Sequence, residues 1–414
     1  MTEIKAFKAI RPTRDKAHLV ASRAVATYKQ SVLDAKLESN PYTFIHIIHP
    51  EYFEDDNNRT APNTRERFLK VRAKYDEFKE KGYLFQDKQD ALYIYRQSSS
   101  LHSYLGIIGG ASVQEYKENK IKKHEATLTS RENMFTNYLN IVGFNAEPVL
   151  LCHQKSEELD AILSKIIQTR PEYEFATTDE MTHELWVATP EEVKTIQTAF
   201  GHIPACYIAD GHHRSASSVR LHDLKQQEGN YDTQKNYNFF LSFFIDYERL
   251  NILPFHRVCK SLNGLSHNEL IAQISTHFEV FPLNKEAYPQ QLHDFHMYVD
   301  SKWYLLRLKD DVNISQNAVS SIDAEILTKY ILSPVLGIHD LTTDENISFI
   351  GGENKLPAVK HSIDAGVNKI GFVLYPVTTK QLIAVSDEGA TMPPKSTWIE
   401  PKMRSGLTIY NIEE

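Results

Sequence analysis

The stretch Ile203-Pro-Ala-Cys-Tyr-Ile-Ala-Asp-Gly-His-His-Arg214 decides the local fold, and Ser215-Ala-Ser-Ser-Val-Arg-Leu-His222 follows it. Cys206 to Ala209 form a short apolar run, which is typical of a buried strand. The Asp-Gly pair that comes next predicts a turn, because glycine adopts backbone conformations that other residues avoid. Small residues and a Val/Leu periodicity after the arginine predict a helix. The stretch therefore indicates a strand, a glycine turn and the start of a helix.

This turn predicts an anion-binding site. The backbone N–H groups and the dipole at the start of a helix favour phosphate, and Gly211, His212, His213 and Arg214 lie at that point. Arg214 adds a forked donor that suits phosphate. Asp210 can hold a metal ion or accept a proton. The alternative interpretation is a surface turn that carries a cluster of polar residues.

Composition excludes several classes of protein. The chain has 414 residues, of which 41% are hydrophobic and 24% are charged, as in ordinary globular proteins with a sizeable core. Its formal net charge of −8 argues against a nucleic-acid partner. No apolar run has the length of a membrane span and the N-terminus lacks a signal-peptide core, so we expect no membrane partner and a cytoplasmic location. Cys152, Cys206 and Cys259 lack zinc or redox spacing and are expected to be buried thiols.

Strand and helix patterns alternate along the chain, which predicts an α+β fold of mixed α/β type: a mixed sheet with flanking helices. The polar stretch from Gln226 to Asn236 is the best linker, so the predicted division is residues 1–235 and residues 236–414. The local predictions include strands at 4–12, 42–49 and 302–308, helices at 17–37, 64–81 and 322–332, and capping boxes at 129–132 and 266–269.

A charged loop precedes the helix that we predict from Ser130 to Ile141. It contains His124 and Glu125, next to two lysines, and Arg131 stands at the start of the helix. Loops on a rigid scaffold are where catalytic groups usually lie. These residues are therefore candidates for a site, and an exposed charged loop is the alternative.

Two further stretches carry candidate anion contacts. His256 and Arg257 follow a proline and are either a phosphate or carboxylate contact or a pair at the edge of the core. In the stretch from Met392 to Leu407, three prolines fix the backbone while many side chains offer donors, which suits an anion. A proline-stiffened surface loop is the alternative. The donors of this stretch are Lys395, Ser396, Thr397, Lys402, Arg404 and Ser405.

Three of these stretches together resemble the bacterial domain of unknown function 1015 family. They are Ile121 to Arg131 with Lys-Lys-His-Glu, Tyr207 to Arg214 with Ile-Ala-Asp-Gly-His-His-Arg, and Met392 to Gly406 with Met-Pro-Pro-Lys-Ser-Thr. Leu253-Pro-Phe-His-Arg-Val258 fits the family too, so the resemblance covers nearly the whole chain. One departure is Arg23-Ala-Val-Ala-Thr-Tyr28, which stands where many members have Pro-Tyr-Asp after the first strand.

The His-Glu and Asp-Gly-His-His-Arg motifs are also similar to those of free serine kinases in the ParB/sulfiredoxin-like group. The resemblance implies a ParB/sulfiredoxin-like core with large insertions, plus a C-terminal α/β portion. It implies that Glu125 and Asp210 serve catalysis and that Gly211, His212, His213 and Arg214 bind nucleotide phosphate. Family members tend to be encoded near serine-biosynthesis enzymes, which implies serine or phosphoserine as the substrate. The implied cofactors are Mg²⁺ and a nucleotide, ATP or ADP.

The leading hypothesis is a phosphotransfer enzyme that acts on a small amino or hydroxy acid. Glu125 would move the proton of the substrate hydroxyl, and Asp210 would hold Mg²⁺ or assist that transfer. Lys395 and Ser396 would close the site. No Walker or kinase glycine loop is present, so any nucleotide must bind in the ParB-like manner.

Three alternatives remain. The first is a phosphoserine-type phosphatase, in which water replaces the acceptor. The second is a non-catalytic nucleotide- or metabolite-binding protein. The weakest is a metal hydrolase with Asp210, His212 and His213 as ligands, because adjacent histidines on a turn point apart.

Overall fold

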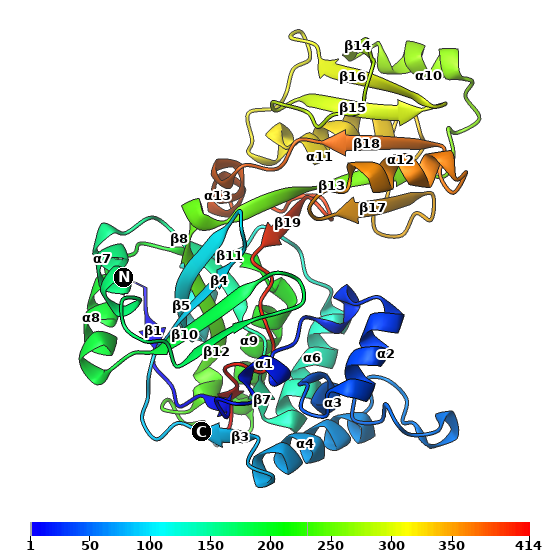
Figure 1. Ribbon diagram of the computed structural model, residues 1–414. Coiled ribbons are helices and arrows are strands. Elements are labelled where there is room, and N and C mark those ends of the chain that lie inside the picture. Colours follow the sequence, from blue (N-terminus) through cyan, green and yellow to red (C-terminus); the bar gives the residue numbers. More distant parts are fainter. Residues whose placement is uncertain (1, 230) are drawn as a thin grey trace. The chain divides into compact units, whose positions relative to one another are not determined.

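The computed structural model describes residues 2–229 and 231–414, and the chain divides into two compact units (Figure 1). Unit 1 comprises the residues up to Lys122, Thr127–Leu250 and Pro401–Glu414, and unit 2 comprises Lys123–Ala126 and Asn251–Glu400. This division differs from the boundary expected after residue 235. The polar stretch before that boundary, of which residue 230 lies outside the described residues, leads into a strand of the unit 1 sheet.

A mixed sheet forms the centre of unit 1, in the order β6-β11-β8-β12-β5-β4-β10-β9, and β1 pairs with β5. The pairs β11–β6 and β12–β8 are parallel, whereas the other pairs are antiparallel. The predicted mixed sheet is thereby confirmed. Its strands are β1 (Ile4–Lys5), β4 (Tyr93–Ser98), β5 (Ser103–Ser112), β6 (Ile121–Lys122), β8 (Val149–His153), β9 (Tyr173–Ala176), β10 (Thr182–Val187), β11 (Cys206–Asp210) and β12 (Phe239–Asp246).

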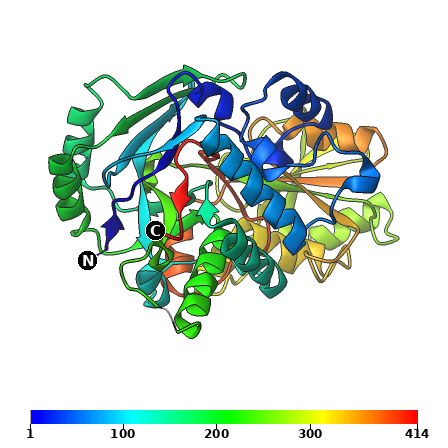
Figure 2. The ribbon, with the colours of Figure 1, turned by 90° about the horizontal axis from the view of Figure 1, so that it is seen from below.

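Helices flank this sheet, as expected. Figures 1 and 2 show α7 and α8 on one side of the sheet, and α6 with α9 on the other. Buried apolar residues of α7 and α8, such as Leu163 and Ile196, pack with Leu151 and Phe244 of the strands in one core cluster. The helices between the strands of this sheet are α5 (Val113–Lys117), α6 (Thr129–Val142), α7 (Glu157–Ile166), α8 (Pro190–Phe200) and α9 (His212–Gln227).

A second core lies between α3, α4, α6 and β7, with Phe44, Phe68, Val71 and Phe144 among its members. The predicted helix at 64–81 is confirmed as α4, which begins after Thr64, whose hydroxyl accepts the backbone N–H of the third residue of the helix. The remaining elements of unit 1 are β2 (Ile10–Pro12), α1 (Ala17–Val20), η1 (Val25–Thr27), α2 (Gln30–Ser39), α3 (Ile45–Ile48), η2 (Asp56–Asn58), α4 (Arg65–Glu80), β3 (Leu84–Gln86), β7 (Phe144–Asn145), η3 (Asn236–Asn238), η4 (Tyr247–Arg249) and β20 (Tyr410–Asn411).

Three N-terminal predictions are wrong, and tertiary contacts explain them. Within residues 42–49, Ile45–Ile48 form the short helix α3 instead of a strand, because one helical turn buries Ile45 against α2 and Ile47 against α4. The helix expected at 17–37 is interrupted where Ser22 exchanges backbone hydrogen bonds with Ser405 of the C-terminal segment. The strand expected at 4–12 is divided into β1, which pairs with β5, and β2, which pairs with β3.

Unit 2 contains an antiparallel sheet in the order β14-β16-β15-β18-β13-β17, and β19 pairs with β13. The predicted strand at 302–308 is confirmed as β16, which pairs with β15. The predicted helix at 322–332 is confirmed as α11 with a π-helical continuation, and the capping box of Ser266 and Glu269 as the start of α10. The elements are β13 (Asn251–Cys259), α10 (His267–Ile274), β14 (Phe278–Leu283), β15 (Asp294–Val299), β16 (Lys302–Leu308), η5 (Val319–Ser321), α11 (Asp323–Leu327), η6 (Thr328–Leu332), β17 (Ile347–Gly351), α12 (Leu356–Asp364), β18 (Ile370–Leu374), α13 (Thr379–Asp387) and β19 (Thr397–Glu400).

The three cysteines are buried thiols, as predicted. Within the described residues, no helix combines the length and the apolar character that crossing a membrane requires.

Candidate functional site

A single glycine connects β11 to α9. Gly211 is the N-cap of α9 and has φ 101° and ψ 28°, in the left-handed region that glycine adopts most readily. A Cβ atom at this position would lie 3.1 Å from three atoms of the Arg214 guanidinium group. Both the backbone conformation and the close approach of Arg214 therefore require glycine. The predicted strand, glycine turn and helix are confirmed.

Two cations hold the carboxylate of Asp210, the last residue of β11. Its Oδ1 accepts a hydrogen bond from Nζ of Lys402 at 3.1 Å, and its Oδ2 accepts one from Nη2 of Arg214 at 2.7 Å. Burial raises the pKa of Asp210, but the charges and hydrogen bonds of Lys402 and Arg214 outweigh it and leave the pKa lowered. The side chain is 37% exposed. Asp210 is thus an ionised, accessible carboxylate at neutral pH, better suited to orienting positive groups than to accepting a proton.

Arg214 connects α9 to the segment between β7 and β8. Its Nη1 forms an ion pair with Oε1 of Glu147 at 3.0 Å and donates to the backbone carbonyl of Pro148. Ser405 donates to the other carboxylate oxygen of Glu147 at 3.4 Å. Arg214 is therefore held in place by charge-assisted bonds, and an anion bound here would share its guanidinium group with Asp210 and Glu147.

The two histidines of the motif differ in environment. His212 is buried, with 4% of its surface exposed, whereas His213 is half-buried. Burial, followed by the charge of Arg131, lowers the pKa of His213, so its imidazole is neutral at physiological pH. Its Nδ1 atom is buried and makes no hydrogen bond to any residue within 2–229 or 231–414. A neutral ring nitrogen is therefore available to a ligand at the start of α9.

Arg131 lies close enough to His213 to act on it electrostatically, which places the start of α6 beside the motif. The helix expected from Ser130 to Ile141 is confirmed as α6, but the capping box at its start is wrong. Leu128 is the N-cap and makes no side-chain cap. Glu132 instead accepts hydrogen bonds from Thr127 and from Arg220 of α9, and this contact between α6 and α9 uses the carboxylate that a capping box would need.

The residues offer little to a divalent metal ion. In the described part of the chain, no group of three or more His, Cys, Asp or Glu side chains is placed to hold one. The triad of Asp210, His212 and His213 suggested for a metal hydrolase therefore does not form. Asp210 would give Mg²⁺ a single carboxylate, which Lys402 and Arg214 already contact. Binding of Mg²⁺ at Asp210 stays a prediction.

Two of the predicted motifs meet within unit 2. The backbone N–H of Met392 donates to the carbonyl of His124 at 2.9 Å, and His124 is buried while Glu125 is exposed. Glu125 thus belongs to unit 2, whereas Asp210 belongs to unit 1.

The predicted donors of the C-terminal stretch serve several purposes. Nζ of Lys395 lies 5.5 Å from the ring centroid of Phe255, and Ser396 donates to the carbonyl of Pro393 at 2.7 Å. Thr397 begins β19. In unit 1, Arg404 pairs with Asp179 at 2.6 Å. Lys395 and Ser396 thus make contacts within unit 2, whereas Arg404 contacts the loop between β9 and β10 and Lys402 contacts Asp210.

His256 and Arg257 are both fully buried in β13. Nδ1 of His256 accepts the backbone N–H of Leu374 at 3.3 Å, and burial, assisted by the charge of Arg257, lowers the pKa of this histidine to about 4. Arg257 donates to the carbonyl of Phe255 and lies 5.3 Å from the ring centroid of Phe349. Of the two interpretations, the structure supports a pair in the core.

No pattern in the sequence pointed to Glu147. It lies between β7 and β8, well before Arg214 in the chain, and only the arrangement of the sheet and α9 brings the two together. Lys402 was a candidate as an anion contact, but its pairing with Asp210 could not be foreseen.

A family model described as "Protein of unknown function (DUF1015)" matches residues 4–325. The chain belongs to this family. The same comparison leaves the activity open, because the family itself carries no described function. No curated protein matches the chain.

Several solved structures are similar at low identity. Free serine kinase in complex with AMP is 14% identical with a TM-score of 0.37, over 74% of this chain and 91% of that one. SbnI with C-terminal truncation from Staphylococcus aureus is 12% identical with a TM-score of 0.39, over 73% and 87%. A conserved hypothetical protein from Pyrococcus furiosus is 15% identical with a TM-score of 0.34, over 73% and 95%. At such identities and TM-scores, the activities of these proteins do not transfer to this chain.

Proposed function

We propose that the chain is a phosphotransfer enzyme that acts on a small amino or hydroxy acid, with serine or phosphoserine as the first substrate to test. The observation that carries the proposal is the junction of β11 and α9, where Lys402 and Arg214 hold an ionised Asp210 beside the N-terminus of a long helix. Such a helix start favours a phosphoryl group through its backbone N–H groups and its dipole. The resemblance of the Asp-Gly-His-His-Arg motif to that of free serine kinases points the same way.

Each residue of the junction has a chemical role in this proposal. Lys402 and Arg214 stabilise the negative charge that builds on the oxygens of the transferred group, and Asp210 fixes both cations in position. His213 contributes a neutral ring nitrogen, which can bond to a phosphoryl oxygen or a leaving oxygen. A pre-ordered set of donors is what phosphoryl transfer needs most from a protein.

The reaction balances as a transfer in either direction. From phosphoserine, the bond between phosphorus and the serine oxygen breaks, a bond to the terminal phosphate oxygen of a nucleoside mono- or diphosphate forms, and serine takes up a proton. We propose Glu125 as the group that supplies this proton. The role of Glu125 is a separate claim and needs its own variant. No step is assigned to Mg²⁺, which would add positive charge at the phosphoryl group when bound.

The first experiment measures serine release from O-phosphoserine with Mg²⁺, in the presence of AMP, of ADP or of no nucleotide. Serine that appears only with nucleotide, together with a phosphorylated nucleotide, supports the proposal. Asp210→Asn should lower this rate by roughly 10²-fold or more, because the two cations lose their charged partner. Glu125→Gln should lower it by a similar factor, roughly 10².

The matched control is Asp223→Asn, which removes a more exposed carboxylate from α9, the helix that follows Asp210. Its rate should equal that of the wild type. Serine release without nucleotide would identify a phosphatase instead. Binding of nucleotide without any turnover, in the wild type and in Glu125→Gln alike, would overturn the proposal in favour of a non-catalytic binding protein.

A further inference from the structure

Unit 1 contains a cavity of about 700 Å³ that adjoins the proposed phosphotransfer junction at Arg214 and Glu147 and extends away from it. Its wall comes from α3, α4, α6, β7, the start of α9 and the segment that precedes α4. Most of this wall is apolar, and its largest side chains are Phe44, Phe68, Phe135, Tyr138 and Phe144. Protein interiors rarely leave voids larger than a water molecule, and pockets of roughly 300–1,000 Å³ are the size of small-molecule sites. A cavity of this volume is therefore a candidate binding site for a small molecule.

Contacts between aromatic rings hold the helices of the apolar wall apart. The rings of Phe68 and Tyr138 meet edge to face at 5.1 Å between α4 and α6, and those of Phe44 and Phe144 meet at 6.3 Å. These contacts brace the helices against one another, so the cavity cannot close without breaking them. The hydroxyl of Tyr138 makes no hydrogen bond to any other residue that the structure describes, so it can bond to a ligand.

The charged residues of the wall are mainly cations. Arg59, Arg67 and Arg214 bring three guanidinium groups to the wall, where Glu147 is the carboxylate; Glu51 pairs with Arg67 and Asp210 with Arg214 from outside the wall. His49 has its pKa lowered by burial and by the charge of Arg67, so it is neutral at physiological pH. An apolar cavity whose wall carries guanidinium donors favours an anion attached to an apolar body.

Arg67 is the best placed anchor for the anionic group. It lines both the apolar cavity and a neighbouring polar hollow of about 550 Å³. One terminal nitrogen of Arg67 pairs with the fully buried carboxylate of Glu51, and its other nitrogens make no hydrogen bond to a described residue. Guanidinium carries five N–H donors, so several remain for a ligand.

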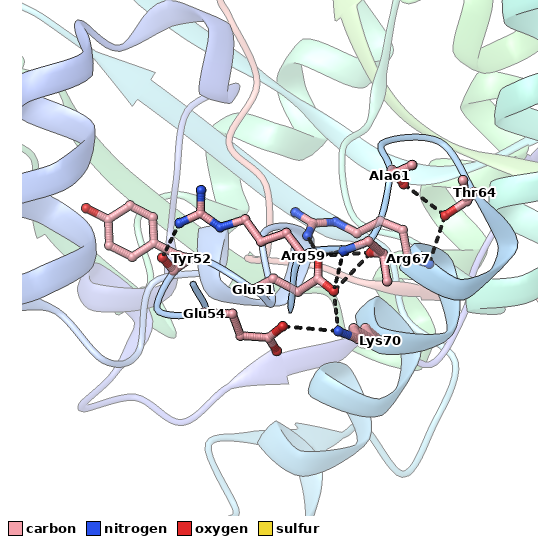
Figure 3. Close-up of polar contacts among 9 residues, drawn as sticks. Glu51, Tyr52, Glu54, Arg59, Ala61, Thr64, Arg67 and Lys70 are labelled. Atoms are coloured by element: carbon pink, nitrogen blue, oxygen red, sulfur yellow. Dashed lines mark hydrogen bonds and ion pairs between the residues drawn. The ribbon is translucent and has the colours of Figure 1, made fainter. Parts of the chain in front are cut away.

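Glu51 orients Arg67. Figure 3 shows the Glu51 carboxylate facing Lys70 and Arg67, while Arg59 extends to the backbone carbonyl of Tyr52. Burial alone would raise the pKa of Glu51, but hydrogen bonds from Lys70, Thr60 and Arg67 lower it to about 2. This ionised carboxylate holds one edge of Arg67 from behind and leaves the other edge for an incoming anion.

We propose that this cavity binds an amphiphilic anion, with an alkyl or aryl body against the aromatic wall and a carboxylate or phosphate head group at Arg67. The inference goes beyond the proposed phosphotransfer: the cavity shares Arg214 and Glu147 with the junction, but the proposed head-group anchor is Arg67, which the phosphotransfer does not use. Binding here needs neither turnover nor Asp210, so each claim can fail while the other stands.

The test is isothermal titration of the full chain with dodecanoate, dodecyl phosphate, dodecanol and inorganic phosphate, each below the concentration at which micelles form. Saturable binding of one dodecanoate or one dodecyl phosphate per chain is expected, with weaker binding of dodecanol. The two anionic probes distinguish a carboxylate head group from a phosphate. Inorganic phosphate should not compete, because it lacks the apolar body.

Two variants separate the body from the head group. Val71→Phe fills the cavity and should weaken all alkyl probes at least tenfold, whereas Val32→Phe, at an exposed valine of α2, should leave them unchanged. Arg67→Gln should weaken only the anionic probes, and Arg65→Gln, on the exposed side of α4, should have no effect. Should Val71→Phe fail to fold, Ala146→Leu fills the same cavity from another segment. No saturable binding, or binding that both filling variants leave intact, would overturn the proposal; equal binding of dodecanol and dodecanoate would overturn its anionic part.

Discussion

His213–Arg214 in unit 1 and His256–Arg257 in unit 2 are both histidine–arginine pairs adjoining a large sheet. The guanidinium group of Arg214 is 20% exposed and contacts two carboxylates, those of Asp210 and Glu147. Arg257 is fully buried, and within the described residues two of its nitrogens have no hydrogen-bond partner. Burial lowers the pKa of Arg257 to about 10, so it remains charged at neutral pH. The same two residue types thus form an accessible site in one unit and a packed core pair in the other.

Nearby carboxylates and solvent exposure of the guanidinium group decide whether such a histidine–arginine pair can bind a ligand. At Arg214 the carboxylates compensate the charge and leave an anion a partly exposed surface to approach. At Arg257 the charge is uncompensated, which normally costs stability, and no exposed surface offers a ligand entry. The predictions below test whether the two pairs really differ in this way.

The largest expected effect concerns acid stability and His256. Because its pKa falls from 6.5 in the unfolded chain to about 4 in the folded one, the folded state binds fewer protons in this window. His256 then stabilises the fold fully above pH 6.5, and this contribution disappears as the pH falls toward 4. A difference of that size corresponds to roughly 3 kcal/mol. Urea titrations between pH 7 and pH 4 should show a shallower loss of stability in His256→Gln than in the wild type.

Asp210→Asn provides the contrast in the same titrations. The pKa of Asp210 is lowered in the folded state, so its contribution is present above the ordinary value of 3.8 and is lost only as the pH falls below it. The difference between this variant and the wild type should therefore stay constant from pH 7 to pH 5. If instead the slope of His256→Gln followed the wild type throughout, His256 would not be a buried neutral histidine.

Some of this contrast was predictable from sequence, and some was not. Gly211 and the junction around it were predictable, because the apolar strand, the glycine and the helical periodicity are local features. The partners of Asp210 and Arg214 were not: Lys402 lies 192 positions from Asp210, and such pairings depend on the complete fold. The burial of His256 and Arg257 was not predictable either. It depends on β17 and β18, which pair with β13 on its two sides.

The cavity shows a similar limit. The stretch at 42–49 has the composition of a strand, yet it folds as α3 and supplies Phe44 to the cavity wall. No periodicity in the separate helices signals a void between them, because the void depends on which side chains meet across α4 and α6. Local pattern therefore predicted the strand, glycine turn and helix of the junction but gave no indication of the cavity.

The next prediction concerns the stability of two variants, Arg214→Met and Arg257→Met. Removing Arg214 leaves the carboxylates of Asp210 and Glu147 and the carbonyl of Pro148 without their donor, which should lower the free energy of unfolding by about 2 kcal/mol. Removing Arg257 replaces an uncompensated buried charge by a flexible apolar side chain, so stability should be unchanged or about 1 kcal/mol higher. Chemical denaturation at pH 7 measures both.

Opposite signs for the two arginines would support the comparison. A loss of more than about 2 kcal/mol in Arg257→Met would show instead that this guanidinium group makes contacts the fold requires. Arg65→Met, at an exposed position of α4, serves as the control for the substitution itself and should change little.

The smallest effect concerns the glycine that makes the junction possible. Gly211→Ala must place a Cβ atom at φ 101° and 3.1 Å from the Arg214 guanidinium group, whereas Gly82→Ala meets a similar left-handed backbone, with φ 67°, in open space. Holding alanine in the left-handed conformation costs about 1 kcal/mol by itself, and this is the decrease in the free energy of unfolding that we expect for Gly82→Ala. Gly211→Ala should lose somewhat more, about 1.5–2 kcal/mol, because Arg214 has to move away from Asp210 and Glu147 as well. The extra loss should disappear in an Arg214→Met background, since methionine has no charged contacts to disturb. If the two glycines cost the same in both backgrounds, the close packing of Gly211 against Arg214 is not what positions the guanidinium group, and the junction owes its geometry to the backbone alone.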